Sequence, residues 1–307
     1  MGVSTWFNEF CNNIRFDETD LSNLRYRYKR ITSRINEDYW GISSDSLHSL
    51  YVGSYGRGTA THLSDIDMLV ILPNSVYERI NKTQGNVQSS LLQEVKRVLQ
   101  KTYSTSYVKA DGQVIGINFT DGINFEIVPC FDLGNGEYTY PDTNSGGSWK
   151  KTNPKAEIDE MNKYNKLTNG NLKNLCKMVR EWKDEHNVEI SGYAIDTIAY
   201  NFIRYYEYKD KTFTYYDWIT RDFFKYLSEQ SEDSYLFAPG SYNYLKIGSK
   251  FNYKAGNAYK KALEAIGDEE KYPISAKKEW REWCEPHLGD IIKKDFYKNE
   301  KSRANEV

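Results

Sequence analysis

The sequence predicts an α+β protein with two lobes, and three observations lead to that prediction. Apolar runs typical of β-strands recur in the first half of the chain, at residues 46–53, 66–72 and 114–128. In the second half, apolar residues recur instead at the three- and four-residue steps of helices. Between the halves, residues 134–155 are rich in Gly, Asn, Ser and Thr, and we interpret them as a loop or linker. We therefore expect a mixed sheet lobe over residues 1–150 and a helical lobe over residues 151–307.

In the first lobe, the spacing of apolar residues predicts each element in turn. A helical face begins at Leu21 and ends near Gly41, and a strand over 46–53 follows it. A second, buried strand runs from Ile66 until Pro73 ends it. A further helix presents one apolar face, formed by Leu91, Leu92, Val95, Val98 and Leu99. Asp121-Gly122 then separates two more strands, as is typical of a tight hairpin turn.

The second lobe is predicted from three apolar helical faces. These faces are Leu172, Leu175, Val179 and Trp182; Ala194, Ile198 and Phe202; and Ile219, Phe223, Tyr226 and Leu227. Residues 205–307 contain no motif that predicts a site, and we expect Trp280 and Trp283 to serve packing.

Composition excludes several classes of protein. The 307 residues carry a net charge of −2 and are 15% aromatic, with 26 Tyr, which argues against a disordered chain and against a bulk binder of duplex nucleic acid. The four Cys and four His are scattered without metal-ligand spacing. We see no apolar run of membrane-spanning length and no signal-peptide pattern, and we expect a cytoplasmic protein without a membrane partner.

Three carboxylates in the first lobe point to metal chemistry. Because side chains alternate along a strand, Asp65 and Asp67 point to the same face. Glu126 lies inside another apolar strand, between Phe125 and Ile127, where a charge needs a partner. Hard oxygen ligands suit Mg²⁺ or Mn²⁺, and two such ions about 4 Å apart are able to clamp a phosphoryl transfer.

A glycine-rich turn precedes the paired aspartates. Gly53-Ser54 is followed by Gly56 and Gly58, and backbone without Cβ atoms can approach phosphate oxygens, while Ser54 adds a hydroxyl donor. Taken alone, each feature has an ordinary explanation: a simple turn, a solvated strand end, or an edge-strand charge. The three features in this order and spacing are much more specific.

At these residues the sequence resembles the polymerase-β-like nucleotidyltransferase superfamily. Within it, the chain is most similar to the cGAS/DncV-like nucleotidyltransferases, relatives of the oligoadenylate synthetases. The resemblance rests on Val52 to Thr59, on Ser64 to Met68, and on Phe125 to Asp132. In characterised members the third carboxylate is usually Asp, whereas here it is Glu126. The resemblance implies a two-lobed fold with an active-site cleft, in which Asp65, Asp67 and Glu126 are catalytic and bind two Mg²⁺ or Mn²⁺ ions.

The resemblance extends to the second lobe, up to about residue 200. Residues 172–183 are similar to the helix whose basic residues grip the triphosphate, and helical geometry places Lys173, Lys177 and Arg180 on one stripe. An ordinary solvated basic face is the alternative for this stripe. Ser191-Gly192-Tyr193 is similar to the Ser-Tyr pair that contacts phosphate and stacks on the donor base, with Gly192 where relatives have Ser. We thus expect the nucleotide to be bound by Gly53, Ser54, Lys177, Arg180, Ser191 and Tyr193.

The activity that the resemblance implies is synthesis of a cyclic di- or trinucleotide from nucleoside triphosphates, with release of pyrophosphate. Such a second messenger would reach a separate effector protein, in antiphage signalling if the chain is bacterial. We expect a monomer that binds no extended nucleic acid. The alternatives are a linear oligonucleotide synthase, a nucleotidyltransferase that acts on RNA, protein or a small molecule, and a non-catalytic nucleotide-binding regulator.

Overall fold

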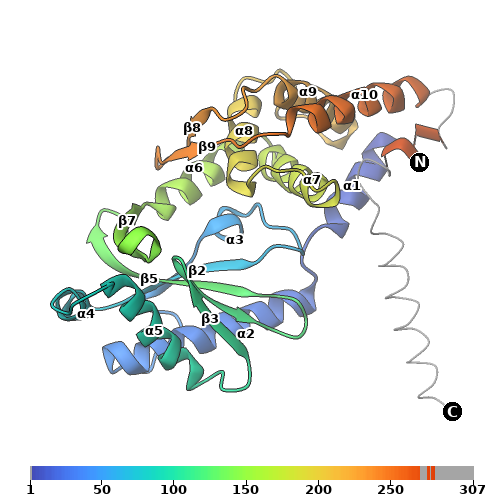
Figure 1. The fold of residues 1–307 in the computed structure, drawn as a ribbon. Coiled ribbons are helices and arrows are strands. Elements are labelled where there is room, and N and C mark those ends of the chain that lie inside the picture. The colour runs from blue at the N-terminus through green and yellow to red at the C-terminus, as the bar shows by residue number, and fades with distance from the viewer. Residues whose placement is uncertain (1, 270–274, 277, 281–307) are drawn as a thin grey trace, which may run out of the picture. The chain divides into compact units, whose positions relative to one another are not determined.

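The computed structural model describes residues 2–269, 275–276 and 278–280 (Figure 1). Their contacts form two compact units. The sheet unit comprises residues 15–167 and 236–245, and the helical unit comprises the described residues of 1–14, 168–235 and 246–307. The chain thus passes from one unit to the other between Leu167 and Thr168, whereas residue 150 lies within a strand, β7 (Ser148–Thr152).

The sheet unit is built on a mixed sheet of seven strands. Five of them lie in the order β1-β2-β5-β4-β3, and β6 pairs with both β5 and β7. Their bounds are β1 (Ser49–Tyr51), β2 (Ile66–Ile71), β3 (Tyr107–Asp111), β4 (Val114–Asn118), β5 (Phe125–Gly134) and β6 (Glu137–Asp142). The β2–β5 pair is parallel, and the other pairs of this sheet in the described residues are antiparallel. The predicted strands after residue 46 are confirmed, and β1 is shorter than expected.

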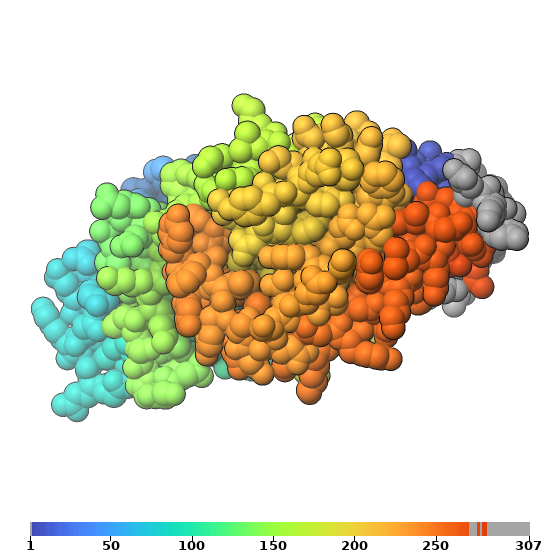
Figure 2. All heavy atoms as spheres, turned by 90° about the horizontal axis from the view of Figure 1, so that it is seen from above, coloured from blue at the N-terminus to red at the C-terminus, as the bar shows by residue number. Residues whose placement is uncertain are grey.

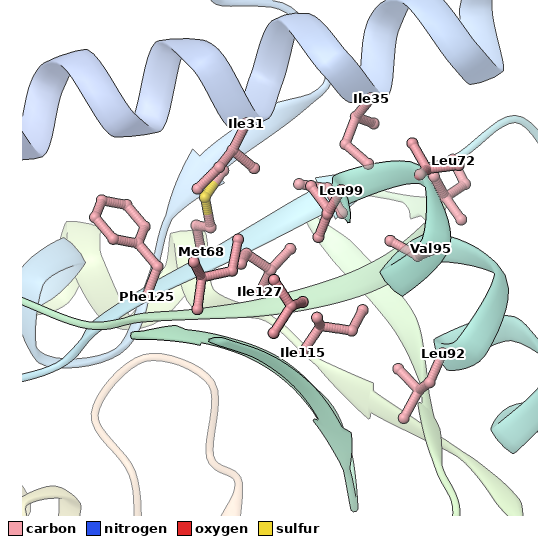
Figure 3. Close-up of a cluster of buried hydrophobic side chains, with 14 of the residues drawn as sticks. Ile31, Ile35, Met68, Leu72, Leu92, Val95, Leu99, Ile115, Phe125 and Ile127 are labelled. Atoms are coloured by element: carbon pink, nitrogen blue, oxygen red, sulfur yellow. The ribbon is translucent and has the colours of Figure 1, made fainter. Parts of the chain in front are cut away.

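Five α-helices accompany this sheet in the described part of the unit. They are α2 (Glu18–Ile35), α3 (Gly53–Arg57), α4 (Asn74–Ile80), α5 (Val87–Gln100) and α6 (Pro154–Leu167). Helix α2 continues through a π-helical turn, Asn36–Trp40, to Gly41, whose φ of 65° ends it where the sequence predicted. Figure 3 shows the core between α2, α5 and the sheet, where Ile31, Met68 and Val95 are fully buried.

The prediction of a loop or linker over residues 134–155 is wrong. Strands β6 and β7 occupy most of this segment, joined by a short 3₁₀ turn, Asn144–Gly146. The Gly and Asn residues that suggested a loop sit at the turns, while Trp149 packs its ring against Tyr77 and Phe131 at centroid distances of 4.9 and 5.7 Å. Composition averaged over the segment hid two short strands that pack through a few aromatic side chains.

The helical unit packs five α-helices in its described residues. They are α1 (Val3–Asn13), α7 (Asn171–Glu185), α8 (Gly192–Ile203), α9 (Tyr216–Ser228) and α10 (Asn252–Asp268), with a 3₁₀ turn at Phe213–Tyr215. The predicted faces of α7, α8 and α9 are buried almost throughout, which confirms these helices. Trp280 is 3% exposed and its ring lies 5.1 Å from that of Phe7, which confirms its packing role, whereas Trp283 lies outside the described residues. No helix in the described ranges has the length and apolarity needed to cross a bilayer.

A two-stranded hairpin, β8 (Tyr235–Phe237) and β9 (Tyr244–Lys246), adds strands to a half that was predicted to be helical. Its residues 236–245 belong to the sheet unit although they follow α9 in the chain. Figure 2 shows this hairpin, in orange, at the surface beside the green part of the same unit. The hairpin loop is closed by a hydrogen bond from the backbone N–H of Ala238 to the carbonyl of Asn243, 2.9 Å long.

Candidate active site

Strands β2 and β5 bring the three predicted carboxylates together. In their parallel register, Asp67 is the direct partner of Glu126. Each lies between two fully buried apolar residues, so strand alternation turns both carboxylates away from the core of Figure 3. Asp65 stands just before β2, and its Oδ1 accepts a hydrogen bond of 3.1 Å from Asn124 Nδ2, just before β5.

These three carboxylates carry like charges and repel one another. Burial, the negative charges of Asp67 and Asp65, and a hydrogen bond with Asp67 raise the pKa of the Glu126 carboxyl to about 7. A hydrogen bond between two carboxyl groups requires a proton on one of them. Burial and the neighbouring carboxylates thus disfavour the charged form of Glu126, which is only partly ionised near neutral pH.

The Gly53 backbone lies directly against this cluster. Gly53 has a φ of 56°, and a Cβ atom at this position would stand 1.8 Å from Asp67 Oδ2, so only glycine fits. The backbone N–H of Val52 donates to the carbonyl of Asp67 over 3.0 Å, which fixes the start of α3 beside β2. Ser54, the next residue after Gly53, is 7% exposed.

The chemical type of these three side chains suits a hard divalent cation. All three groups are carboxylates, the ligands that Mg²⁺ and Mn²⁺ prefer, and a cation would compensate the mutual repulsion that raises the pKa of Glu126. Within the ranges that the structure describes, no set of three or more His, Cys, Asp or Glu side chains is arranged so that it could hold a metal ion. The ligand role of these residues therefore stays a prediction.

In the helical unit, the predicted nucleotide-binding residues lie on α7 and at the start of α8. Arg180 is engaged with Asp196 of α8: its Nε and Nη2 donate to the two carboxylate oxygens over 2.9 and 2.8 Å. The two side chains are 11% and 1% exposed. Gly192 packs on the guanidinium, since a Cβ atom there would stand 2.2 Å from Arg180 Nη1. The space taken by Arg180 leaves little room for a side chain at position 192.

The remaining predicted contacts have local roles in the structure. The Ser191 hydroxyl caps α8 by accepting a hydrogen bond of 3.0 Å from the backbone N–H of Ala194. Lys177 and Tyr193 are half-buried, and burial lowers the pKa of Lys173. The predicted stripe on α7 is thus not an ordinary solvated face. Binding of nucleotide by Lys177, Arg180, Ser191 and Tyr193 stays a prediction.

Sequence reasoning missed two partners of the site residues. Asn124 donates a hydrogen bond to Asp65, and the sequence indicates this contact only by the position of Asn124 before an apolar strand. Asp196, which holds Arg180, stands sixteen residues after it and four residues after Gly192. An acidic residue inside an otherwise apolar helix was the available signal, because such a residue needs a partner when buried.

Comparison with known proteins identifies the class. Residues 1–165 match the family model of the Second Messenger Oligonucleotide or Dinucleotide Synthetase (SMODS) domain. This match covers more than half of the chain, and the chain therefore belongs to the SMODS family. Its homologues are cyclic nucleotide synthases, which are nucleotidyltransferase enzymes, as the resemblance predicted.

Individual relatives agree with this assignment. The chain is 25% identical over 179 residues to a cyclic AMP-AMP-AMP synthase of Acinetobacter sp., and the match covers 57% of this chain and 51% of that relative. The chain thus spans about half the length of this curated relative. Among solved structures, Escherichia coli CdnC with ATP has a TM-score of 0.65 at 15% identity, covering 91% of this chain and 96% of CdnC. Apo DncV of Vibrio cholerae has a TM-score of 0.70 at 11% identity, covering 93% and 95%. These likenesses confirm the predicted cGAS/DncV-like fold.

Proposed function

We propose that this chain joins nucleoside triphosphates into a cyclic di- or trinucleotide and releases pyrophosphate. The observation that carries the proposal is the register of Asp67 with Glu126, with Asp65 nearby and the Gly53 backbone against Asp67. This arrangement gathers acidic side chains beside a turn with little side-chain bulk, as a site for a metal-bound triphosphate requires. The names of the relatives support a cyclic product.

In this proposal, a ribose hydroxyl attacks an α-phosphate and pyrophosphate leaves. Asp65, Asp67 and Glu126 would hold two Mg²⁺ or Mn²⁺ ions, and such ions would supply positive charge that stabilises the phosphates and favours deprotonation of the hydroxyl. A bound cation would lower the pKa of Glu126, which burial and the charges of Asp67 and Asp65 raise to about 7 in its absence. Gly53 and Ser54 contact phosphate oxygens through the turn.

The helical unit supplies the remaining contacts of the nucleotide. Lys177 neutralises charge on the triphosphate, together with Arg180, which Asp196 holds in a fixed orientation. Tyr193 stacks on a base, and Ser191 or the backbone beside it contacts phosphate. The proposed biological setting is antiphage signalling by a cytoplasmic monomer whose product activates a separate effector protein.

The test is product analysis with a variant that loses two carboxylate charges, Asp65→Asn with Asp67→Asn. Labelled nucleotide products are separated by thin-layer chromatography before and after phosphatase, and identified by mass spectrometry. We expect a phosphatase-resistant product from the wild type and a loss of about three orders of magnitude or more in the variant, because metal positioning supplies much of the rate. A matched control, Asp45→Asn with Asp159→Asn, changes two exposed aspartates of the same unit and should keep full activity.

Other outcomes decide between the alternatives. A phosphatase-sensitive product would indicate a linear oligonucleotide, and label transferred to RNA, protein or a small molecule would indicate another acceptor. Nucleotide binding without turnover would indicate a regulator. Unchanged activity in the Asp65→Asn and Asp67→Asn variant would show that the site assignment is wrong.

A further inference from the structure

The buried carboxylate of Glu157, on α6, is contacted by side chains from two distant parts of the chain. Arg57 Nη1 donates to its Oε2 over 3.2 Å. Ser241 Oγ and Asn243 Nδ2 donate to its Oε1 over 2.8 and 3.3 Å. Glu157 is 5% exposed and Arg57 is 6% exposed. One carboxylate thus joins the end of α3 to the loop of the β8–β9 hairpin.

The contact with Arg57 fixes the segment that carries the predicted phosphate-binding turn. Arg57 is the last residue of α3, and Gly53, its first residue, lies against the Asp67 carboxylate. Between them, Gly56 packs so closely that a Cβ atom would stand 2.7 Å from the Tyr51 carbonyl oxygen and 3.1 Å from Ile158 Cδ1 of α6. Helix α3 is therefore held between α6 and the carboxylate cluster, with little room to shift at either end.

The contact with the hairpin is equally close. Gly240 has a φ of 78°, and a Cβ atom there would stand 2.2 Å from the carbonyl oxygen of Ala156, so the hairpin loop rests directly on α6. Ser241 and Asn243 follow in this loop and lie 84 and 86 residues after Glu157 in the sequence. Through Glu157, a loop from late in the chain reaches the residues beside the active site.

Stability alone is a poor explanation for this arrangement. Burial removes Arg57 and Glu157 from water, and the desolvation cost of a buried ion pair is often as large as its attraction. A pair of this kind does restrict geometry, because its donors and acceptors are matched only in one arrangement. The arrangement that it selects here is the placement of α3.

We propose that Glu157 is a positioning residue for nucleotide binding: it links the β8–β9 hairpin to α3 and so sets how the Gly53–Ser54 turn meets the substrate triphosphate. The inference rests on the proposed function. Loss of the hairpin contacts leaves the Arg57–Glu157 pair less constrained, and the turn then meets the phosphates in a wider range of positions. Because phosphates contact the turn both before and during reaction, the loss appears in KM more than in kcat.

The test compares two variants of the full chain by steady-state kinetics with nucleoside triphosphate. Glu157→Gln offers one acceptor oxygen for both sets of donors, and we expect KM to rise about tenfold. Ser241→Ala with Asn243→Ala keeps the ion pair and removes only the hairpin contacts, and we expect KM to rise about threefold with kcat within about twofold. Binding of a fluorescent ATP analogue should weaken in the same order.

A matched control removes one Asn and one Ser elsewhere in the sheet unit, as Asn81→Ala with Ser90→Ala. These residues contact Trp149 Nε1 and the Asn86 carbonyl, away from α3 and α6. The control should keep the wild-type KM even where thermal unfolding shows a loss of stability like that of the hairpin variant. Turnover with an unchanged KM in both test variants would overturn this inference alone. No turnover by the wild type would overturn the proposed function and the inference with it.

Discussion

The carboxylate cluster of the sheet unit and the Arg180–Asp196 pair of the helical unit both place charge inside the protein, and they balance it differently. Burial, with the charges of Asp67 and Asp65, raises the pKa of Glu126 to about 7, so the charged form of this carboxyl is disfavoured. The positive charge of Arg180 is instead neutralised within the fold by Asp196, whose two carboxylate oxygens accept its hydrogen bonds. In the proposed function the first cluster accepts a cation, whereas the second is already paired within the fold.

Glycine makes the close approach possible in both regions. A Cβ atom would collide with a charged side chain at Gly53, against Asp67, and at Gly192, against Arg180. Gly53 also needs its positive φ, whereas Gly192 is a helical residue that needs only the space. In both places, backbone without a side chain lies next to the charge that the proposed chemistry uses.

The largest effect that this comparison predicts is a loss of turnover when the Glu126 carboxylate is removed. Glu126→Gln removes one of three like charges, and we expect product formation to fall by about three orders of magnitude, because the cluster no longer offers three anionic donors. Glu126→Asp keeps the charge and shortens the reach, and we expect it to stay within about tenfold of wild type. Radiolabelled product formation measures both. Equal activity of Glu126→Gln and wild type would place the chemistry elsewhere.

The next effect is on stability, in the helical unit. Asp196→Ala leaves the Arg180 guanidinium buried without its carboxylate, and we expect a loss of about 3–5 kcal/mol in the free energy of unfolding. Urea denaturation followed by circular dichroism measures it. Glu189→Ala is the control, since Glu189 pairs with Lys250 at the surface, with 63% and 73% of the side chains exposed, and should cost less than about 1 kcal/mol. Similar losses in both variants would contradict the distinction between buried and surface pairs.

The smallest effect concerns Glu181, the neighbour of Arg180 in the chain. Burial, with smaller contributions from Asp184 and Glu185, raises the pKa of Glu181 from 4.5 to about 7. The folded state therefore keeps a proton that the unfolded state loses, and the free energy of unfolding falls as pH rises from about 4.5 to about 7.

Glu181→Gln removes this dependence. We expect the variant to match the wild type near pH 4.5 and to exceed its stability by up to about 3 kcal/mol at pH 8. Urea unfolding at both pH values is the measurement. The same gap between variant and wild type at both pH values would show that Glu181 does not carry the effect.

Much of the candidate site was predictable because it follows from local rules. Alternation along a strand predicts that Asp65 and Asp67 share a face, and an acidic residue in the apolar run of β5 predicts that Glu126 needs a partner. The helices α2, α5, α7, α8 and α9 were predictable for the same reason, since their apolar faces repeat at helical spacing.

Other features were not predictable, because they depend on contacts between distant residues. Strands β6 and β7 contain too many polar residues for their pattern to stand out, and they are stabilised by pairing, β6 with β5 and β7 with β6. The bond from Asn124 to Asp65 spans 59 residues, and no periodicity indicates it. Residues 236–245 belong to the sheet unit, where Ser241 and Asn243 donate hydrogen bonds to Glu157.

The sequence by itself determined which chemical groups this protein has and near which elements they stand: three carboxylates on or just before two strands, a Gly-Ser turn before them, and basic residues on a helix. Only the tertiary structure decided which charges meet. It set Asp67 beside Glu126, paired Arg180 with Asp196, and joined Arg57 to a late hairpin through Glu157. The physical reason is that periodicity reports how a residue faces its own element, whereas the strength of a charge interaction depends on distance and burial, which only the packed chain defines.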